Sequence, residues 1–451
     1  MHAPETIIRP AMRSYLAETA GFASGRGNPR DFLERCLADL ETWEPKIGAF
    51  VTLNLAVARA AADAATARWR AGKPLSQIDG MPIGIKDIIE TIDMPTEQGS
   101  PLFVGWRTER DAAAVAALRE AGAVVLGKTV TTEFAATFPR GTRNPWDLAR
   151  TPGGSSSGSA AAVAAGLVPA ALGTQVIGST IRPASYCGCY GFKPTVGALN
   201  RGGSYDGLSQ SSTGTIAASL AECWQVAYEI AIRAGGDPGF PGLAGPPSAP
   251  RAAKPRKIAF IETAGWALAT PAAKQAMQDA LTRLAAVGVE IRTRDDDETV
   301  EAVETAIAEA RKRSMAVNAW ESRWPLNTYR TRDASKLSGP ALDRLRQAEA
   351  MTIDSYRDLL RGRAEARALY GELADEVDVT VSLSAPAAAP VGLDSTGEPA
   401  CTVHTSYLGI PAISLPLFRD EGLPLGLQVV GFANRDAETF AAAAFMEQAL
   451  G

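Results

Sequence analysis

The chain has 451 residues, of which 46% are apolar and 21% are charged, a composition typical of a globular enzyme. This length suits either one large α/β domain or two domains. The net charge of −5 gives no electrostatic reason to expect nucleic acid or an anionic membrane as a partner. Five scattered cysteines, with no second Cys/His pair to complement Cys187-Gly-Cys189, exclude an evident zinc site and favour a reduced compartment.

No segment of the sequence indicates a membrane or secreted protein. The first ten residues, Met1–Pro10, lack the apolar segment of a secretory signal. The run of lowest polarity, residues 159–176, is mostly Ala and Gly and is interrupted by Pro169, so it is too weak for a membrane span. We therefore expect a soluble, cytoplasmic enzyme.

The first part of the chain reads as a helical segment followed by a β-α-β unit. Apolar residues recur at helical spacing within residues 11–75. A strand is predicted over Met81–Ile89, an Ala-rich helix over Asp111–Ala121 and a buried strand over Ala123–Gly127. This strand-helix-strand order predicts parallel pairing and an α/β core.

The rest of the chain supplies further strands and long helices. Strand-like segments are Lys257–Ile261, Val377–Leu383, Ala412–Leu417 and Leu425–Val430. Helices are predicted from Ser159 to about Ala165, and over residues 271–287, 300–313, 314–372 and 436–450, whereas Gly235–Lys257 reads as a surface connection. We expect one domain over 1–451, with a helical N-terminal part (1–75), a core (76–235), a variable helical region (236–375) and C-terminal core strands with a closing helix (376–451).

Lys86 is the first candidate for chemistry. It stands in the apolar segment Pro82-Ile-Gly-Ile-Lys-Asp-Ile-Ile89. Amide hydrolysis needs an activated nucleophile, a base for its proton and donors for the oxyanion. A lysine is a base only when it is neutral, which burial or nearby positive charge can bring about. The alternative is a lysine at a strand edge whose ammonium group reaches water.

A Gly/Ser-rich loop holds the second candidate, Ser155. The loop Gly153–Ser159 precedes an Ala-rich helix, so its amides are expected at a helix N-terminus. It is not a phosphate loop, because no Gly-Lys-Ser/Thr follows. One alternative is a flexible connector. Another is the Gly-x-Ser-x-Gly elbow of α/β-hydrolases centred on Ser156, which needs a later histidine, and His404 is the one that follows.

The stretch Gly173-Thr-Gln-Val-Ile-Gly-Ser179-Thr-Ile-Arg182-Pro-Ala184 completes a set with these two segments. A lysine in an apolar strand, followed by two small-residue loops with serines, resembles the amidase signature family of serine hydrolases. The resemblance covers about residues 10–235 and 375–450, and residues 236–375 carry no motif. Further similar segments are Gly80–Asp87, Gly127–Phe134, Gly191–Pro194, Gly409–Pro416 and Gly422–Gly431.

The resemblance implies an α/β fold with a mixed central β-sheet covered by α-helices, and a Ser-cisSer-Lys triad without metal or organic cofactor. It makes Ser179 the nucleophile, Ser155 the middle of a proton relay after a cis peptide bond, and Lys86 the base. It implies an oxyanion hole of backbone amides from Val176, Ile177, Gly178 and Ser179. The substrate-binding candidates are Arg182, Phe134 and Gly154.

Two departures from the family pattern concern the substrate. Members usually carry Thr-Gly-Gly-Ser or Thr-Ala-Gly-Ser up to the nucleophile, whereas this chain has a branched Ile177 there. We expect Ile177 to stiffen the loop and give the acyl pocket an apolar wall, with Phe134, Phe138 and Trp146 as further apolar surface. Arg182 follows Ser179 by three residues, which resembles the malonamidase-like branch, where this arginine can meet a substrate carboxylate; a structural ion pair is the alternative.

The expected function is hydrolysis of the C–N bond of small-molecule amides through an acyl-enzyme on Ser179. Carbamates (urethanes), aryl acylamides and ureas present the same carbonyl–nitrogen unit, so hydrolysis of these compounds stays open. A second alternative is the A-type subunit of a glutamine-dependent amidotransferase, although no basic patch that would face tRNA is evident. The expected partner is a small amide or carbamate, with no nucleic acid and no membrane, and the sequence leaves a homodimer open.

Overall fold

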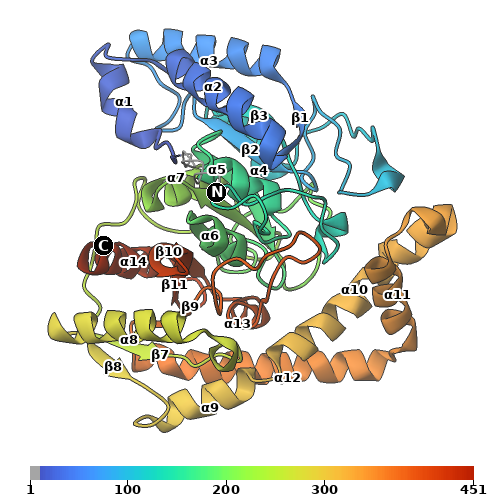
Figure 1. Cartoon of the computed structure of the whole chain (residues 1–451), viewed down its shortest axis with the longest axis vertical. Coiled ribbons are helices and arrows are strands. Elements are labelled where there is room, and N and C mark those ends of the chain that lie inside the picture. Colours follow the sequence, from blue (N-terminus) through green and yellow to red (C-terminus); the bar gives the residue numbers. More distant parts are fainter. Residues whose placement is uncertain (1–10) are drawn as a thin grey trace, which may run out of the picture.

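The computed structural model describes residues 11–451, so the first ten residues, where no signal segment was found, lie outside the described part. Within residues 11–451, eleven strands form one mixed sheet in the order β1-β3-β2-β4-β6-β5-β10-β11-β9-β7-β8. Helices surround it, with α1–α3 at the top of Figure 1 and α8, α9 and α12 at the bottom. The predicted α/β fold, a mixed sheet covered by helices, is confirmed.

The strands in chain order are β1 (Phe50–Leu53), β2 (Pro82–Lys86), β3 (Val124–Thr129), β4 (Ala170–Gln175), β5 (Tyr190–Lys193), β6 (Ser212–Ala217), β7 (Lys257–Phe260), β8 (Glu290–Arg292), β9 (Val379–Leu383), β10 (Ala412–Asp420) and β11 (Leu423–Val430). The helices are α1 (Leu16–Ala23), α2 (Pro29–Ile47), α3 (Leu55–Arg70), α4 (Ala113–Glu120), α5 (Ser157–Ala164), α6 (Ile181–Cys187), α7 (Leu220–Ala234), α8 (Pro271–Ala286), α9 (Glu298–Ile307), α10 (Ala310–Asp333), α11 (Gly339–Ala350), α12 (Ile353–Glu372), α13 (Val403–Leu408) and α14 (Asp436–Leu450). Short 3₁₀ turns include η1 (Pro101–Phe103) and η2 (Glu133–Ala135).

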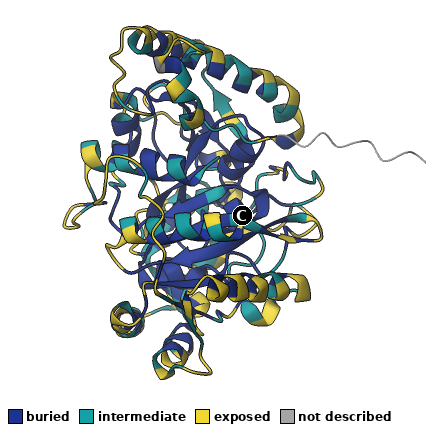
Figure 2. Ribbon diagram, turned by 90° about the vertical axis from the view of Figure 1, so that its left-hand side faces the viewer, coloured by how far each residue is buried: buried dark blue, intermediate teal, exposed yellow. Residues whose placement is uncertain are grey.

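The centre of the sheet is buried on both faces. Strand β2 pairs in parallel with β3 and β4, as the β-α-β order predicted for β2 and β3. Every residue of β2, β3, β4 and β6 is buried, and Figure 2 shows this dark layer inside the more exposed helices. Strands buried on both faces are normally continuous apolar runs. A lysine at the end of β2 is therefore an exception that needs a reason.

Helix α5 is a core helix, although its sequence resembles a flexible connector. All of its residues are buried, and it packs on β4. A side chain at Gly158 would collide with the backbone of Ala49 and Val130, so this close approach requires glycine. The small residues of this segment therefore serve packing, and the connector alternative is wrong.

Two sequence predictions need correction. The N-terminal segment predicted as helical contains the edge strand β1, which pairs antiparallel with β3 and is too short, at four residues, to show alternation. The helix predicted over 300–313 is divided, because α9 ends at Ile307 and α10 begins at Ala310. The break was hidden in the sequence, since the buried positions keep helical spacing across it: Val300, Val303, Ile307, Ala310, Ser314 and Val317.

Helices α10 and α11 form what we call the helical arm, at the right of Figure 1. Within α10, Trp324 leaves helical geometry just before Pro325, as expected because proline disfavours the α conformation of the preceding residue. The arm contacts the η1 segment through one apolar cluster, which comprises Leu102, Phe103, Leu326, Leu337, Ala341 and Leu345. Within residues 11–451, no helix is both long and apolar enough to span a membrane.

Candidate active site

Lys86 lies at the end of β2 with its ammonium nitrogen fully buried. Its Nζ donates to Ser155 Oγ at 2.8 Å and to Thr174 Oγ1 at 2.8 Å, with a longer contact to the Thr174 carbonyl at 3.4 Å. Within the described residues, no carboxylate forms an ion pair with it. Burial lowers the pKa of Lys86 to about 7, and the charge of Asp206 partly opposes this shift.

The carboxylate of Asp206 was not anticipated from the sequence. It is buried and accepts hydrogen bonds from Ser204 Oγ at 2.6 Å and Ser211 Oγ at 2.5 Å. It lies in the loop between β5 and β6, far from Lys86 in sequence, and no local motif marks it. Thr174 was likewise missed, although it lies inside the Gly173–Ala184 stretch.

The two serine-bearing loops meet beside Lys86. The Gly154–Ser155 peptide bond is cis, as the resemblance implied. The next amide, that of Ser156, donates to the Ser179 carbonyl at 3.3 Å, so the loop before α5 and the loop before α6 are in contact. Residues 176–179 connect β4 to α6 and line a cavity, in which Ser179 is 9% exposed. The fold thus brings Lys86, Ser155 and Ser179 to one place.

The loop that carries Ser179 is held in shape by Gln175, the last residue of β4. Its Oε1 accepts from the amides of Thr180 and Ile181 at 3.0 and 3.1 Å, and its Nε2 donates to Thr405 and Ser406 of α13. A side chain at Gly178 would overlap Thr402, so glycine is required next to Ser179. Helix α13 therefore packs against this loop and holds it in place.

Arg182 is buried and is bound to protein groups. Its Nη2 donates to the Gly154 carbonyl at 2.6 Å and to Thr396 Oγ1 at 3.0 Å. It also lines the cavity, and burial lowers its pKa below the ordinary arginine value. Of the two predicted roles, these contacts favour a structural one, because they tie α6 to the loop that carries Ser155. The acceptors are neutral, however, so the predicted ion pair is not what holds it.

The cavity has a volume of about 860 Å³ and is the space onto which Ser179 opens. One side is the Ser179 loop, and Ile177 lines it while also packing against the core. Further lining residues come from η1, η2 and the helical arm, and they include a group of aromatic side chains. Phe103, Phe134 and Tyr329 touch one another there, with ring centroids 5.0 to 6.2 Å apart.

The other sequence-predicted substrate residues lie outside the cavity lining. Phe138 is exposed beneath the Arg140 guanidinium, and Trp146 donates to the Cys187 carbonyl at 2.8 Å. Gly154 packs against Thr396 and Thr132 instead of facing the cavity. Of the three aromatic candidates, Phe134 alone faces the substrate space. No motif could have indicated the wall that the helical arm contributes, since residues 236–375 carry none.

Arg344 on α11 is a cation in the cavity lining without a protein partner. It is half-buried, and within residues 11–451 no carboxylate or carbonyl oxygen bonds to it. Burial lowers its pKa below the ordinary arginine value, with no acidic neighbour to oppose the shift. By contrast Arg311, which also lines the cavity, is paired with Glu398 at 2.7 Å.

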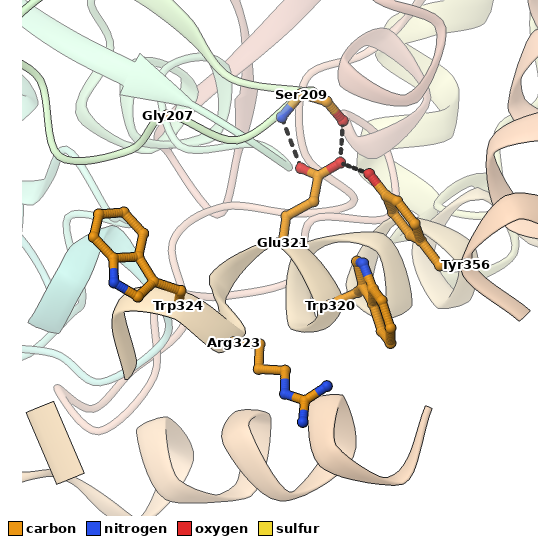
Figure 3. A pocket seen from close by; sticks show the side chains of 7 residues that line it. All are labelled: Gly207, Ser209, Trp320, Glu321, Arg323, Trp324 and Tyr356. Carbon is orange, nitrogen blue, oxygen red and sulfur yellow. Dashed lines mark hydrogen bonds between the residues drawn. The ribbon is translucent and has the colours of Figure 1, made fainter. Parts of the chain in front are cut away.

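An open outer pocket of about 570 Å³ adjoins the cavity and shares Gly207, Glu321 and Trp324 with it. Figure 3 shows Trp324 on one side and Trp320 with Tyr356 on the other, with Glu321 between them. The Glu321 carboxylate accepts from the Ser209 amide at 2.7 Å, from the Ser209 hydroxyl and from the Tyr356 hydroxyl at 2.8 Å. This carboxylate therefore ties the loop after Asp206 to the arm.

The geometry contradicts a Ser156–His404 elbow. Ser156 Oγ donates to the Thr174 carbonyl and accepts from the Thr174 amide, both at 3.3 Å. His404 is buried in α13, and neither of its ring nitrogens has a hydrogen-bond partner among the described residues. Burial lowers the pKa of His404 to about 3, so it is neutral. Residues 11–451 also contain no group of three His, Cys, Asp or Glu side chains arranged to hold a metal ion.

Comparison with known proteins gives consistent matches over most of the chain. The family model described as Amidase matches residues 31–440. The A-type subunit of glutamyl-tRNA(Gln) amidotransferase from Chloroflexus aggregans (strain MD-66 / DSM 9485) is 34% identical over 463 aligned residues, which cover 92% of this chain and 91% of that protein. The corresponding protein from Anaeromyxobacter sp. (strain K) is 32% identical, with 96% and 95% covered.

Solved structures match equally broadly. A structure described as "Crystal structure of amidase" superimposes with a TM-score of 0.84 and 26% identity, and the match covers 97% of this chain and 100% of that one. The native peptide amidase from Stenotrophomonas maltophilia superimposes with a TM-score of 0.74 and 25% identity, with 99% and 97% covered. The similarity therefore includes the helical arm and is not confined to the core motifs.

Proposed function

The chain belongs to the amidase family, and from this premise we propose that it hydrolyses the C–N bond of small-molecule amides through an acyl-enzyme on Ser179. The observation that carries the proposal is the buried hydrogen bond between Lys86 Nζ and Ser155 Oγ at 2.8 Å, next to the loop of Ser179. A lysine with a pKa near 7 can be neutral at working pH, as a general base must be.

The contacts of Lys86 suit a relay. A neutral amine has two N–H groups and one lone pair, and Thr174 offers two acceptors, its hydroxyl and its carbonyl. Donation to both leaves the lone pair for the Ser155 hydroxyl, so in the neutral state the hydrogen bond between these two groups reverses and Ser155 donates to Lys86 Nζ. Lys86 then takes the proton of Ser155 while Ser155 takes that of Ser179, and Ser179 Oγ attacks the amide carbonyl.

The remaining steps use the loop and the same relay in reverse. The backbone amides at residues 176–179 donate to the oxyanion of the tetrahedral intermediate. The proton held by Lys86 returns through Ser155 to the departing nitrogen, so the C–N bond breaks and an amine leaves. Water, deprotonated through the same pair, then attacks the acyl-enzyme; the bond between the acyl carbon and Ser179 Oγ breaks, the proton returns through Ser155 to Ser179, and the acid leaves. No metal or organic cofactor enters this scheme, and we expect a cytoplasmic enzyme.

The residues that line the cavity favour substrates with an apolar or aromatic part. Phe103, Phe134 and Tyr329 face the Ser179 loop across a space large enough for a drug-sized molecule. Ile177 adds an apolar wall on the side of Ser179. A small malonamate-like anion would leave these rings uncovered, so we expect it to be a poor substrate.

The test is a hydrolysis screen of the purified protein across aliphatic amides, aryl acylamides, aryl carbamates and ureas, with the Ser179→Ala variant as the blank. We expect turnover of amides with an aryl or alkyl portion. Faster turnover of carbamates or ureas would move the proposal to that substrate class, with the same residues. Failure of every compound, with the protein folded, would contradict the proposed hydrolase.

The second candidate is an A-type subunit that uses glutamine, as the names of the most similar curated relatives suggest. One observation favours it: Arg344 lines the cavity without a protein partner, and the α-carboxylate of glutamine would supply one. Under this candidate, the isolated chain hydrolyses glutamine poorly until a partner protein is added, and Arg344→Gln raises KM for glutamine. Efficient hydrolysis of aryl amides by the chain alone, with no glutaminase activity, would exclude it.

A further inference from the structure

The outer pocket differs from an ordinary surface depression in its composition. Trp320 and Tyr356 stack with their ring centroids 5.4 Å apart and an interplanar angle of 18°. Across from them stands Trp324, which is 71% exposed. The indole of Trp324 has no hydrogen bond and no ring contact among the described residues. The Arg323 guanidinium also lines the pocket and lies over the Trp320 ring, 6.0 Å from its centroid. Aromatic rings and a planar cation are surfaces on which a flat aryl group stacks.

Trp324 takes no part in the arm's apolar cluster. Because it precedes Pro325, it leaves the helical conformation within α10. An exposed indole forgoes the stabilisation that burial of a large aromatic side chain would give. A bound apolar group that covers this indole would therefore be stabilised by the contact.

The outer pocket is continuous with the proposed substrate cavity. Trp324 and Glu321 line both, so a chain that leaves the cavity passes directly between them. Other large apolar side chains of the cavity lining are also exposed, namely Trp106, Tyr205 and Met315. The carboxylate of Glu321 already accepts hydrogen bonds from Ser209 and Tyr356, so this carboxylate is satisfied by the protein itself.

We propose that the outer pocket is a second binding subsite, which holds an aryl or similarly flat apolar group at the far end of a substrate whose scissile amide lies at Ser179. The proposal rests on the proposed amide hydrolysis and adds a substrate class to it: amides that carry a terminal aryl group on a spacer. The group stacks between Trp324 and the Trp320–Tyr356 pair, and the spacer crosses the mouth of the cavity.

Two series of amides test the length dependence. In the first, primary amides of ω-phenylalkanoic acids run from phenylacetamide to 8-phenyloctanamide, with the extension on the acyl side. In the second, N-(ω-phenylalkyl)acetamides place it on the amine side. We expect kcat/KM to rise by roughly tenfold or more at the length that reaches the outer pocket, in at least one series.

Substitutions then show which residues cause the increase in kcat/KM. Trp324→Ala should lower kcat/KM for the long homologues roughly tenfold more than it lowers kcat/KM for phenylacetamide, and Trp324→Phe, which keeps a flat ring, should retain most of the gain. Trp320→Ala should act in the same direction. Ile353→Ala is the matched control, since Ile353 is an exposed apolar residue at the start of α12 that lines neither pocket, and it should change nothing.

Binding measurements test the proposed subsite independently of the proposed amide hydrolysis. Calorimetry of 8-phenyloctanamide and phenylacetamide with Ser179→Ala, and with Ser179→Ala/Trp324→Ala, reports on the subsite without turnover. If the wild-type protein hydrolyses no amide, the proposed function fails while the calorimetry still decides the subsite. A length dependence that is absent in both series, or that survives Trp324→Ala and Trp320→Ala, overturns the subsite even if amides are hydrolysed.

Discussion

At the scale of single residues, the chemistry depends on the charge state of Lys86. A lysine that is buried without a carboxylate partner loses its proton easily, because only neutral oxygens from Ser155 and Thr174 surround its nitrogen. Asp206 opposes this effect from a distance through its negative charge. The balance between burial and that one carboxylate therefore sets the pH at which the proposed base becomes available.

The pH dependence of hydrolysis should follow this balance. Since the pKa of Lys86 is lowered to about 7, the neutral form grows as the pH rises through 7, and kcat/KM should increase there and stay high in the alkaline range. Asp206→Asn removes a charge that raises the pKa of Lys86, so the rising limb should move to lower pH. Asp394→Asn, which changes an exposed carboxylate of the cavity lining, is the control. A limb that stays in place or moves to higher pH in Asp206→Asn would contradict this account.

The proposed nucleophile can be identified by covalent labelling. Ser179 opens onto the cavity, whereas Ser156 Oγ is engaged with the backbone of Thr174. A fluorophosphonate probe should therefore attach to Ser179, as read by mass spectrometry of the digested protein, and Ser179→Ala should show neither adduct nor turnover. An adduct on Ser156 would instead revive the elbow hypothesis.

Lys86 and Ser155 should behave as one unit. Each alanine variant is expected to lower kcat by several orders of magnitude, and the double variant should be little worse than either, because both residues move the same proton. His404→Ala should stay within roughly tenfold of the wild type, about 1.4 kcal/mol, if buried His404 has no part in proton transfer. A loss in His404→Ala as deep as that in Lys86→Ala, with the fold intact, would argue against Lys86 as the base.

At the scale of elements, the site has two halves from different parts of the chain. The loops before α5 and α6 carry the two serines of the proposed relay and are fixed by buried neighbours such as Gln175. The opposite wall belongs to the helical arm, which is attached to η1 and η2 by one apolar cluster. Glu133 adds polar ties, since it accepts from Ser100 Oγ and from the Ser338 amide, both at 3.1 Å.

The attachment of the arm can be weakened by one substitution. Leu345 is fully buried in the cluster, so Leu345→Ala should cost about 2–5 kcal/mol through lost contacts and the cavity left behind. Limited proteolysis should then cut the arm near residues 330–350 faster than in the wild type, and KM for aryl amides should rise. Leu342→Ala on the same helix, at a partly buried position, should have a smaller effect. Equal proteolysis of both variants and the wild type would show that the cluster does not hold the arm.

At the scale of the whole molecule, the proposed reaction needs nothing beyond the side chains and amides of this chain. Dialysis against EDTA should therefore leave the rate of hydrolysis unchanged, as measured by amine release before and after treatment. Metal-dependent recovery of a lost activity would contradict the scheme. The same purified sample, examined by size-exclusion chromatography with light scattering, would decide whether the chain is a monomer or a homodimer.

Much of this protein could be predicted from its sequence, because features that depend on neighbouring residues leave a recognisable pattern in those residues. Buried strands appear as apolar runs, so Lys86 is conspicuous in β2, and close backbone approach leaves glycine and serine in the two loops. Together with the Gly173–Ala184 stretch, these segments carry the family resemblance, which in turn implied the mixed α/β fold and the three residues that the structure brings together. The cis bond before Ser155 came from the family resemblance alone.

The tertiary structure decided what depends on residues distant in sequence. Asp206 affects Lys86 only because the β5–β6 loop folds over it, and Arg344, Tyr329 and Trp324 reach the cavity only because the arm packs on η1. None of these contacts has a periodicity or spacing that a single sequence can display. The break between α9 and α10 could not be predicted for a related reason: the buried residues keep helical spacing across it. The proposed reacting groups could thus be found from segments that are local in sequence, whereas the shape of the substrate space is a property of the packed chain.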